Sequence, residues 1–253
     1  MKIEGVIISV EEFAINDGPG VRMTIFLKGC PIRCVWCHNP EGQRFGPEPI
    51  VRNGIEEICG IRIDSEDMAK RLLKNEKVLK MMEGGVTFTG GEPLSQGMFL
   101  IDVLERIKGH IHTSIETSGY AVPQVFHKVV KLTDFIQMDF KFANNELHRR
   151  FTGADNETIR ENLAYLCASE KPFAIRIPLI PGINDTEDNA EKTAELLADA
   201  KNLQYVEFLR YNKLAGAKYA MLGREYNPPF DENAEPQVHA KPFEKLNIKT
   251  VVL

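Results

Sequence analysis

The sequence predicts an α/β fold in which parallel strands form a partial (β/α)6 barrel. Short apolar runs rich in β-branched and aromatic residues alternate with helical patterns along all 253 residues. Each strand–helix unit takes roughly 25–35 residues, which is typical of parallel strands joined by crossover helices. The chain holds about five or six such units, fewer than the eight of a closed barrel. We therefore expect a six-stranded, partial TIM-like barrel with extra edge strands, formed by one domain over residues 1–253.

Eight segments have the composition of β-strands. In chain order they are Val6–Val10, Met23–Leu27, Val86–Thr89, Thr113–Thr117, Phe135–Phe140, Ala174–Ile180, Tyr205–Tyr211 and Lys249–Leu253. The Pro- and Gly-rich stretches Glu41–Pro49 and Asn227–Pro236 are expected to be surface loops.

Helical periodicity occupies the intervals between these strands. Leu100–Ile107 and Ile159–Leu166 place apolar residues three and four positions apart, as on one face of a helix. Two further helices have an expected N-cap: Asp64 or Ser65 before a helix through Met68, Leu72 and Leu79, and Asp185 or Thr186 before one that runs to Ala200.

The composition is that of an ordinary globular protein, with 43% hydrophobic and 26% charged residues. No apolar run approaches the roughly 20 residues of a membrane span, and the N-terminus lacks a basic region followed by an apolar core. The net charge of −5 argues against general attraction to nucleic acid or to anionic membranes. Because five cysteines are too few for a secreted disulfide framework, we expect a cytoplasmic protein.

Polar and glycine-containing motifs follow the ends of the expected strands. They are Gly29–His38, Gly90–Pro93, Ser118–Gly119, Lys141 and Asn212. Because ligands collect at the C-terminal ends of parallel strands, we expect these motifs to form one site.

Cys30, Cys34 and Cys37 form the most specific pattern, Cys-x3-Cys-x2-Cys. Three thiolates this close together can bind one iron–sulfur cluster, and a four-iron cluster with three cysteines keeps one iron open. Two alternatives remain. One is a structural zinc site with His38 as the fourth ligand, and the other is incidental clustering of the cysteines.

The cysteine spacing resembles that of the radical S-adenosylmethionine (SAM) superfamily. The preceding segment Asp17–Arg22, with the letters DGPGVR, resembles the signature of glycyl-radical-enzyme activating enzymes of the pyruvate formate-lyase activase type. Further segments extend the likeness over nearly the whole chain: Gly90–Pro93, Glu116–Tyr120, Met138–Lys141, His148 with Thr152–Gly153, Arg176 with Pro181–Gly182, and Leu222–Tyr226.

The resemblance implies an activity and its cofactors. Cys30, Cys34 and Cys37 would hold one 4Fe-4S cluster, and SAM would bind the fourth iron. An electron from flavodoxin or ferredoxin would cleave SAM to a 5′-deoxyadenosyl radical, which removes a hydrogen from a glycine Cα of a partner glycyl radical enzyme. Some family members carry a ferredoxin-like insert with further clusters. Here only Cys59 lies in that interval, so we expect no insert.

The resemblance also implies site residues. Asp17 would position the partner's glycine, and a monovalent cation would lie near Asp139 beside SAM. The SAM site would comprise Trp36, Cys37, His38, Gly90, Gly91, Glu92, Glu116, Thr117, Asp139, Phe140, Lys141, Arg176 and Asn212. Asn212 stands where pyruvate formate-lyase-type members often have His.

Each of these assignments has a structural alternative. Gly90 and Gly91 let the backbone approach a ligand closely, or they form a simple turn. Glu116, Asp139 and Lys141 could form a salt bridge at the barrel rim, and Asp17 could cap its own loop.

Arg176 lies between two isoleucines, so we expect it to face a polar interior and to need a charged partner such as a ligand carboxylate. Two functional alternatives also remain. One is a radical SAM enzyme that acts on a small molecule or a peptide. The other is a non-catalytic electron-transfer or zinc module.

Overall fold

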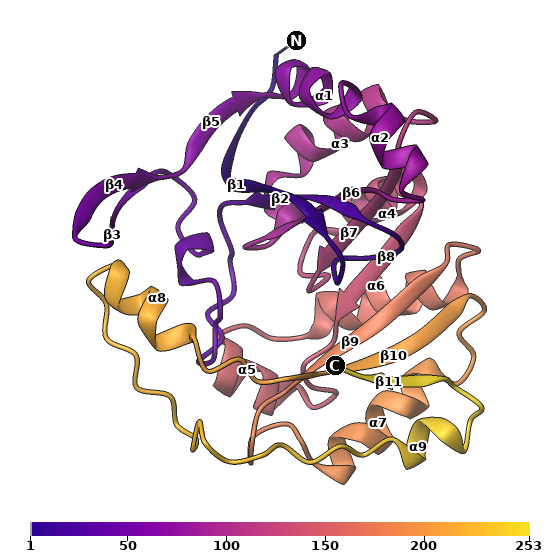
Figure 1. Ribbon diagram of the computed structural model, residues 1–253. Coiled ribbons are helices and arrows are strands. Elements are labelled where there is room, and N and C mark those ends of the chain that lie inside the picture. The colour runs from indigo at the N-terminus through magenta and orange to yellow at the C-terminus, as the bar shows by residue number, and fades with distance from the viewer. Residues whose placement is uncertain (1) are drawn as a thin grey trace.

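The computed structural model describes residues 2–253, and its main feature is a nine-stranded sheet that curves into a partial barrel (Figure 1). The strand order is β11-β10-β9-β8-β7-β6-β2-β1-β5. From β2 to β11 every neighbouring pair is parallel, whereas β1 is antiparallel to both β2 and β5. The strands are β1 Glu4–Ala14, β2 Arg22–Leu27, β5 Ile61–Asp64, β6 Gly85–Gly90, β7 His112–Thr117, β8 Phe135–Asp139, β9 Phe173–Leu179, β10 Leu203–Arg210 and β11 Thr250–Val252.

This arrangement confirms the predicted fold class. β2 and β6 to β10 form the six barrel strands, and β1, β5 and β11 are the additional edge strands. All eight predicted strands are present. The hairpin of β3 (Glu48–Arg52) and β4 (Ile55–Cys59) and the edge strand β5 were not predicted.

Most helices lie outside the curved sheet (Figure 1), whereas Asn145–Thr152 packs against the cysteine loop and Ala215–Met221 against the segment that follows it. The helices are α1 Ser65–Leu73, α2 Glu76–Met81, α3 Gly97–Ile107, α4 Pro123–Leu132, α5 Asn145–Thr152, α6 Glu157–Ala168, α7 Glu187–Leu197, α8 Ala215–Met221 and α9 Lys241–Glu244, with short 3-10 turns at Pro40–Gly42 and Pro93–Gln96. Asp64 caps α1 and Thr186 caps α7, as predicted. The helix expected through Leu79 breaks into α1 and α2, and α7 ends at Leu197 rather than Ala200. No helix of residues 2–253 is long and apolar enough to cross a bilayer.

The two expected surface loops have different outcomes. Asn227–Pro236 contains no helix or strand, as predicted. Glu41–Pro49 contains most of the first 3-10 turn and the first residues of β3, and Glu48 in it is 4% exposed. The Pro and Gly residues of this stretch therefore belong to tight turns beside the buried Glu48, and the stretch is not simply a surface loop.

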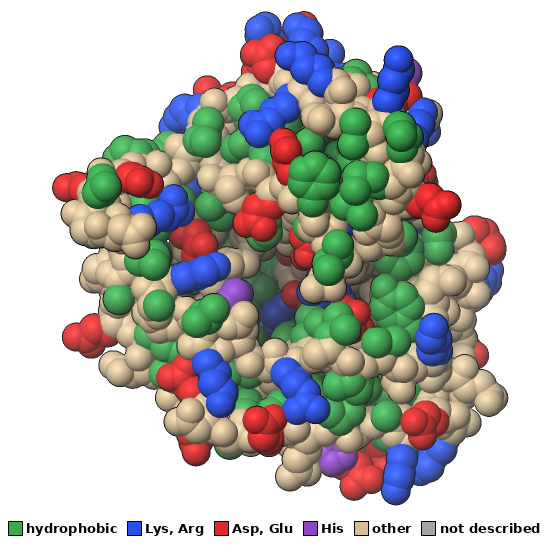
Figure 2. Space-filling view, in the orientation of Figure 1, with side chains coloured by type: hydrophobic (Ala, Val, Ile, Leu, Met, Phe, Trp, Pro, Cys, Tyr) green, Lys and Arg blue, Asp and Glu red, His purple; other side chains and the backbone are tan. Residues whose placement is uncertain are grey.

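The barrel strands separate an apolar exterior from a polar interior. Side chains such as Ile25, Phe88 and Ile175 point outward into the core under the helices, where they are completely buried. Because successive side chains of a strand alternate between faces, their neighbours point inward. These inward residues include Thr24, Thr87, Thr89, Ser114, Glu116, Gln137, Arg176 and Glu207. The face shown in Figure 2 is hollowed at its centre.

Candidate active site

A cavity of about 390 Å³ lies at the C-terminal ends of the barrel strands. Its wall contains the cysteine loop, the turn after β6, and the ends of β7, β8, β9 and β10. The structure brings together at this wall most of the residues predicted for cluster and SAM binding: Cys30, Cys34, Trp36, Cys37, His38, Gly90, Gly91, Glu92, Glu116, Thr117, Asp139, Lys141, Arg176 and Asn212.

Phe140 is the exception among the predicted SAM residues. It is 1% exposed and belongs to the apolar core outside the barrel, not to the cavity wall. Asp139 and Lys141 face the cavity, so the residue between them points to the opposite side. The Phe140 side chain is therefore not placed to contact a ligand in this cavity.

The cysteine loop is closed at its base by main-chain hydrogen bonds. The Gly29 amide donates to Gly42 O at 2.8 Å, and the Cys30 amide donates to Gln43 O at 3.2 Å. These two bonds join the start of the loop, at Gly29 and Cys30, to residues that follow the third cysteine. The loop that carries all three thiols therefore has fixed ends.

Gly91 packs directly against this loop. A Cβ at Gly91 would lie 2.4 Å from Gly29 O and 2.5 Å from Gly42 O, which are both main-chain atoms. The Glu92 amide donates to Gly29 O at 2.8 Å and joins the same two segments. The turn after β6 thus supports the cysteine loop, and Gly91 is required for that contact.

A buried charged cluster supports the segment that follows Cys37. Lys28, which is completely buried, pairs with Glu48 at 2.7 Å and also donates to Glu41 O at 2.5 Å. Arg224 pairs with Glu48 at 2.5 Å and donates to Pro40 O at 3.2 Å. We call Lys28, Glu48 and Arg224 the loop clamp. Arg224 follows α8, which packs against the 3-10 turn of this segment (Figure 1).

The three thiols of the loop are poorly solvated. Burial raises the pKa of Cys30, Cys34 and Cys37, in the case of Cys34 to about 12, although Lys141 opposes the rise at Cys34. Thiolates in such surroundings need a compensating cation, and iron fits this donor set. Within residues 2–253 no three His, Cys, Asp or Glu side chains are placed to hold a single metal ion, and the zinc alternative gains no support.

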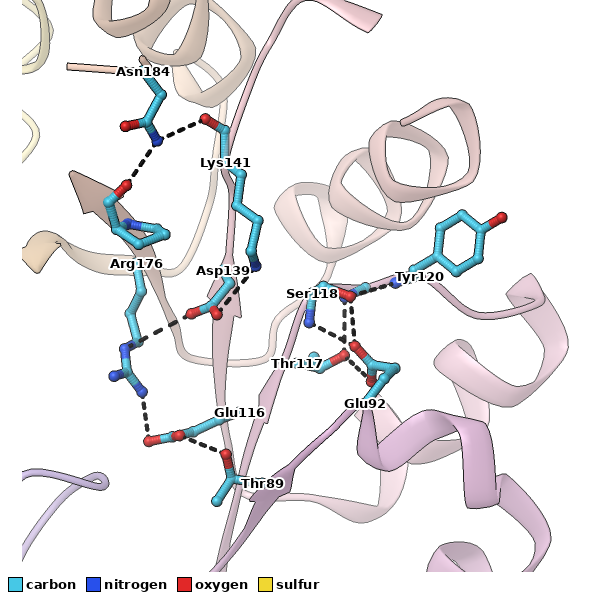
Figure 3. A network of polar contacts seen from close by, with 12 residues as sticks. Thr89, Glu92, Glu116, Thr117, Ser118, Tyr120, Asp139, Lys141, Arg176 and Asn184 are labelled. Atoms are coloured by element: carbon cyan, nitrogen blue, oxygen red, sulfur yellow. Dashed lines mark hydrogen bonds and ion pairs between the residues drawn. The ribbon is translucent and has the colours of Figure 1, made fainter. Parts of the chain in front are cut away.

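Glu92 is 1% exposed and joins two turns of the cavity wall (Figure 3). Its Oε1 accepts from the Leu94 amide and the Thr117 hydroxyl, and its Oε2 accepts from the amide and the hydroxyl of Ser118. Burial raises the pKa of Glu92, and these bonds oppose that rise. Because four donors already use the carboxylate, its visible role is to hold the turn after β6 against the turn after β7.

A charged network spans the floor of the cavity (Figure 3). Arg176 lies 2.5 Å from Glu116, 3.3 Å from Glu207 and 3.9 Å from Asp139, and Lys141 lies 3.3 Å from Asp139. Burial lowers the pKa of Arg176, but the three carboxylates outweigh this and hold it above its usual value. Arg176 faces a polar interior as predicted. Its charged partners are carboxylates of this chain.

Three other predicted residues line the cavity with less polar contact. Trp36 is 5% exposed and packs against Phe142, with ring centroids 6.0 Å apart. His38 has a buried Nε2 without a hydrogen-bond partner in the described chain, and burial lowers its pKa. The Asn212 side-chain oxygen accepts from the Leu214 amide at 3.0 Å.

Asp17 lies at the other end of the barrel, outside the wall of this cavity. Its Oδ2 accepts from the Thr24 hydroxyl at 2.6 Å, and its main-chain oxygen accepts from the Thr87 hydroxyl at 2.6 Å. Since Thr24 and Thr87 are inward residues of β2 and β6, the Asp17 carboxylate faces the barrel interior. Both bonds join Asp17 to other strands, so neither is the contact within its own loop that a loop-capping role would require.

Glu207 belongs to the charged network but was not predicted. It is 7% exposed on β10, between the buried apolar residues Val206 and Phe208. The same signal, one charge within an apolar strand, had identified Arg176. Glu207 could therefore have been found from the sequence by the same criterion. Thr24 and Thr87 carry no such signal, because a threonine in a strand is ordinary.

Comparison with known proteins identifies the family. Residues 24–197 match the Radical SAM superfamily. The trans-4-hydroxy-L-proline dehydratase activating enzyme of Clostridioides difficile is 30% identical over 300 residues, covering 98% of each chain. The isethionate sulfite-lyase activating enzyme of Oleidesulfovibrio alaskensis is 31% identical over 277 residues, covering 88% of this chain and 89% of the relative. The chain therefore belongs to the radical SAM superfamily and, within it, to the glycyl-radical-enzyme activating enzymes.

Solved structures agree with this assignment. A domain of pyruvate-formate lyase-activating enzyme from Bacteroides vulgatus superimposes with a TM-score of 0.55 at 27% identity, over 67% of this chain and 99% of that one. QueE from Escherichia coli superimposes with a TM-score of 0.58 at 16% identity, over 99% and 94% of the two chains, and supports the fold alone. The resemblance predicted from the cysteine loop and Asp17–Arg22 is confirmed.

Proposed function

We propose that this enzyme uses a 4Fe-4S cluster and SAM to form a glycyl radical on a partner enzyme. When bound, the reduced cluster supplies one electron that cleaves SAM to methionine and a 5′-deoxyadenosyl radical. That radical takes the Cα hydrogen of one partner glycine, leaving 5′-deoxyadenosine and a glycyl radical. The observation that carries the proposal is the placement of the cysteine loop and Asp17 at opposite ends of one polar barrel interior.

The charged network around Arg176 has one net negative charge, with Glu116 and Asp139 at this cavity and Glu207 on the side of the barrel interior near Gly18. Glu116, Asp139 and Glu207 carry three negative charges, whereas Arg176 and Lys141 carry two positive ones. SAM has an ammonium, a sulfonium and a carboxylate, hence one net positive charge that balances the network. We assign SAM to this cavity and the cluster to Cys30, Cys34 and Cys37. A monovalent cation near Asp139 would be a second way to balance the negative charge of the network.

Asp17 is assigned to the partner. Its carboxylate faces the interior and can accept hydrogen bonds from main-chain amides of an extended glycine-containing segment. Such contacts would hold the glycine Cα near the reacting carbon, where small displacements cost large factors in rate.

One cluster and no ferredoxin-like insert are further parts of the proposal. Between the cysteine loop and β6 the chain has only a 3-10 turn, the β3–β4 hairpin, β5 and two helices, with Cys59 as its single cysteine. The alignment with the C. difficile relative spans 300 residues although this chain has 253, so the relative carries segments that are absent here. We propose a single domain over residues 1–253 that is reduced by flavodoxin or ferredoxin in the cytoplasm.

The test is a panel of purified glycyl radical enzymes. Relatives of this chain are activating enzymes for trans-4-hydroxy-L-proline dehydratase, 4-hydroxyphenylacetate decarboxylase, isethionate sulfite-lyase and choline trimethylamine-lyase. The reconstituted chain, SAM and a reductant are mixed anaerobically with each enzyme, and the glycyl radical is read by electron paramagnetic resonance. A radical on at least one enzyme is expected. SAM cleavage without a radical on any of them would favour the small-molecule or peptide alternative.

The Asp17→Ala variant tests the assignment to the partner. Radical formation on the accepted enzyme should fall roughly tenfold or more, because the partner segment loses its hydrogen-bond acceptor. SAM cleavage without the partner is measured in the same preparation and reports on the cluster and SAM separately. Equal losses of the two activities would mean that Asp17 is structural.

A further inference from the structure

Arg22 is the last residue of the DGPGVR segment and the first residue of β2, and its side chain is completely buried. Within residues 2–253 it makes no ion pair with a carboxylate, unlike the other fully buried cation, Lys28. Burial lowers its pKa to about 10. Since a buried charge without a carboxylate partner is expensive, the guanidinium must be compensated by hydrogen bonds.

All five N–H groups of Arg22 have acceptors. Nε donates to the Thr87 hydroxyl at 3.0 Å, and Nη1 donates to Pro19 O at 3.0 Å and lies 3.1 Å from His112 Nδ1. Nη2 donates to Val86 O and His112 O. The side chain thus joins the Asp17 loop to the first residues of β6 and β7. A lysine has three donors on one atom and cannot reproduce this fork.

One of these bonds leads directly to Asp17. The Thr87 oxygen accepts from Arg22 Nε, so its single proton is free to point the other way, and it donates to Asp17 O at 2.6 Å. On the other side of the loop, Arg22 holds Pro19 O. Arg22 therefore fixes the main chain on both sides of Gly18.

The loop fits this place only with glycines. Gly18 has a φ of +127°, and a Cβ there would lie 3.3–3.5 Å from Gln137, Ser114 and Arg22. Gly20 has a φ of +70°, and its Cβ would lie 1.9 Å from Glu83 O. The Asp17–Gly20 turn thus lies against β2, β6 and β7 at the N-terminal end of the barrel without side-chain bulk.

We propose that Arg22 is a positioning residue for hydrogen abstraction. Through Thr87 and Pro19 it holds the Asp17 main chain, so that the carboxylate meets the partner's glycine in one orientation. This inference rests on the proposed function, in which Asp17 binds the partner segment. Arg22 itself does not line the cavity assigned to SAM.

Three variants test the inference. Arg22→Lys keeps the charge and removes the fork, and Thr87→Val removes the hydroxyl at nearly constant shape. Thr87→Ser keeps the hydroxyl and is the conservative rescue. The matched control is Thr193→Val on α7, which removes another buried hydroxyl, one that donates to Asn189 O far along the chain from the barrel loop.

The readout is the number of glycyl radicals formed per 5′-deoxyadenosine, measured with the enzyme that the wild-type chain activates. Arg22→Lys and Thr87→Val should lower this ratio roughly tenfold or more while SAM cleavage without partner is retained, because orientation rather than radical formation is lost. Thr87→Ser and Thr193→Val should keep the wild-type ratio. The loss should lie in kcat more than in the KM for the partner.

Two results would overturn the inference. One is an unchanged ratio in a folded Thr87→Val variant. The other is an equal loss of both activities in Arg22→Lys and Thr87→Val, which would make the interaction structural. A failure of the proposed function is distinct, because the wild-type chain would then form no glycyl radical on any enzyme of the panel.

Discussion

At the scale of single residues, Gly91 connects the turn after β6 to the cysteine loop. The sequence suggested that this glycine lets the backbone approach a ligand, and the structure shows that its close neighbours are Gly29 O and Gly42 O of the cysteine loop. A side chain at this position must therefore displace the loop before it can affect SAM.

We predict that Gly91→Ala lowers cluster content. The added Cβ meets two main-chain oxygens that cannot move without opening the base of the loop, so iron per chain after anaerobic reconstitution should fall roughly twofold or more. Gly46→Ala is the control, because nothing lies within 4 Å of a Cβ there. Normal iron content together with weakened SAM binding in Gly91→Ala would contradict this prediction, because it would mean that Gly91 makes room for SAM rather than for the cysteine loop.

His148 predicts a pH dependence of stability. It is 1% exposed, its Nδ1 lies 2.8 Å from Ala154 O, and burial lowers its pKa below the usual value of 6.5. The unfolded chain therefore takes up a proton first as the pH falls below about 6.5, and the folded state loses stability in that window.

Replacement by glutamine should flatten this dependence. The free energy of unfolding in urea should drop less between pH 7.5 and pH 5.5 for His148→Gln than for wild type, by at most about 1.4 kcal/mol, because pH 5.5 lies about one pH unit below the usual histidine pKa. The exposed His110, changed to Gln, serves as the control. Identical pH slopes in the two variants would contradict the prediction.

Residues with a distinctive spacing or strand position could be predicted from the sequence. Residues whose role depends on a contact with a distant segment could not. The three cysteines and Arg176 stand out by spacing or by an unusual strand position. Arg22 and Thr87 do not, because their importance depends on a contact between β2, β6 and the Asp17 loop. The core position of the Phe140 side chain was missed for a related reason, because a sequence motif does not show which face of the sheet each of its side chains occupies.

At the scale of elements, the loop clamp joins three segments that are distant in sequence. Lys28 follows β2, Glu48 begins β3, and Arg224 follows α8. The predicted strands are recognisable because their outward residues form one apolar core. The β3–β4 hairpin was missed because only Glu48, Ile50 and Cys59 of its residues are buried, so it lacks that apolar pattern.

We predict that Glu48→Ala is strongly destabilising. It leaves the fully buried Lys28 without its carboxylate, and removing one partner of a buried pair costs about 3–5 kcal/mol. Glu57→Ala removes a carboxylate from the exposed pair with Arg52 on the same hairpin and should cost about 0–1 kcal/mol. Urea unfolding of the two reduced apoproteins gives the comparison. Similar losses would mean that the clamp is solvated.

At the scale of the whole molecule, the partial barrel was predictable because strand–helix alternation and motif position both follow from the parallel topology. That the Asp17 loop lies at the opposite end of the same interior was not predictable. The loop lies between β1 and β2, and only the curvature of the whole sheet brings it under Ser114 and Gln137.

We predict about four irons per chain in the reconstituted protein, since three cysteines can hold one four-iron cluster. Cys37→Ala should lose most of this iron. Cys59→Ala is the control, because Cys59 is 3% exposed at the end of β4 and does not line the cavity of the cysteine loop. Iron analysis of the two variants decides the matter, and a need for Cys59 would contradict a single three-cysteine site.

The loop clamp also has a consequence for the order of assembly. Glu48 and Arg224 are 176 residues apart, so a nascent chain that has emerged only through β6 already carries Cys30, Cys34 and Cys37 but not the arginine that braces their loop. At that stage the cysteine loop lacks the contacts of Arg224 with Glu48 and Pro40 O. Metal insertion is therefore expected to follow synthesis, after the C-terminal quarter has folded onto the segment that follows the cysteines.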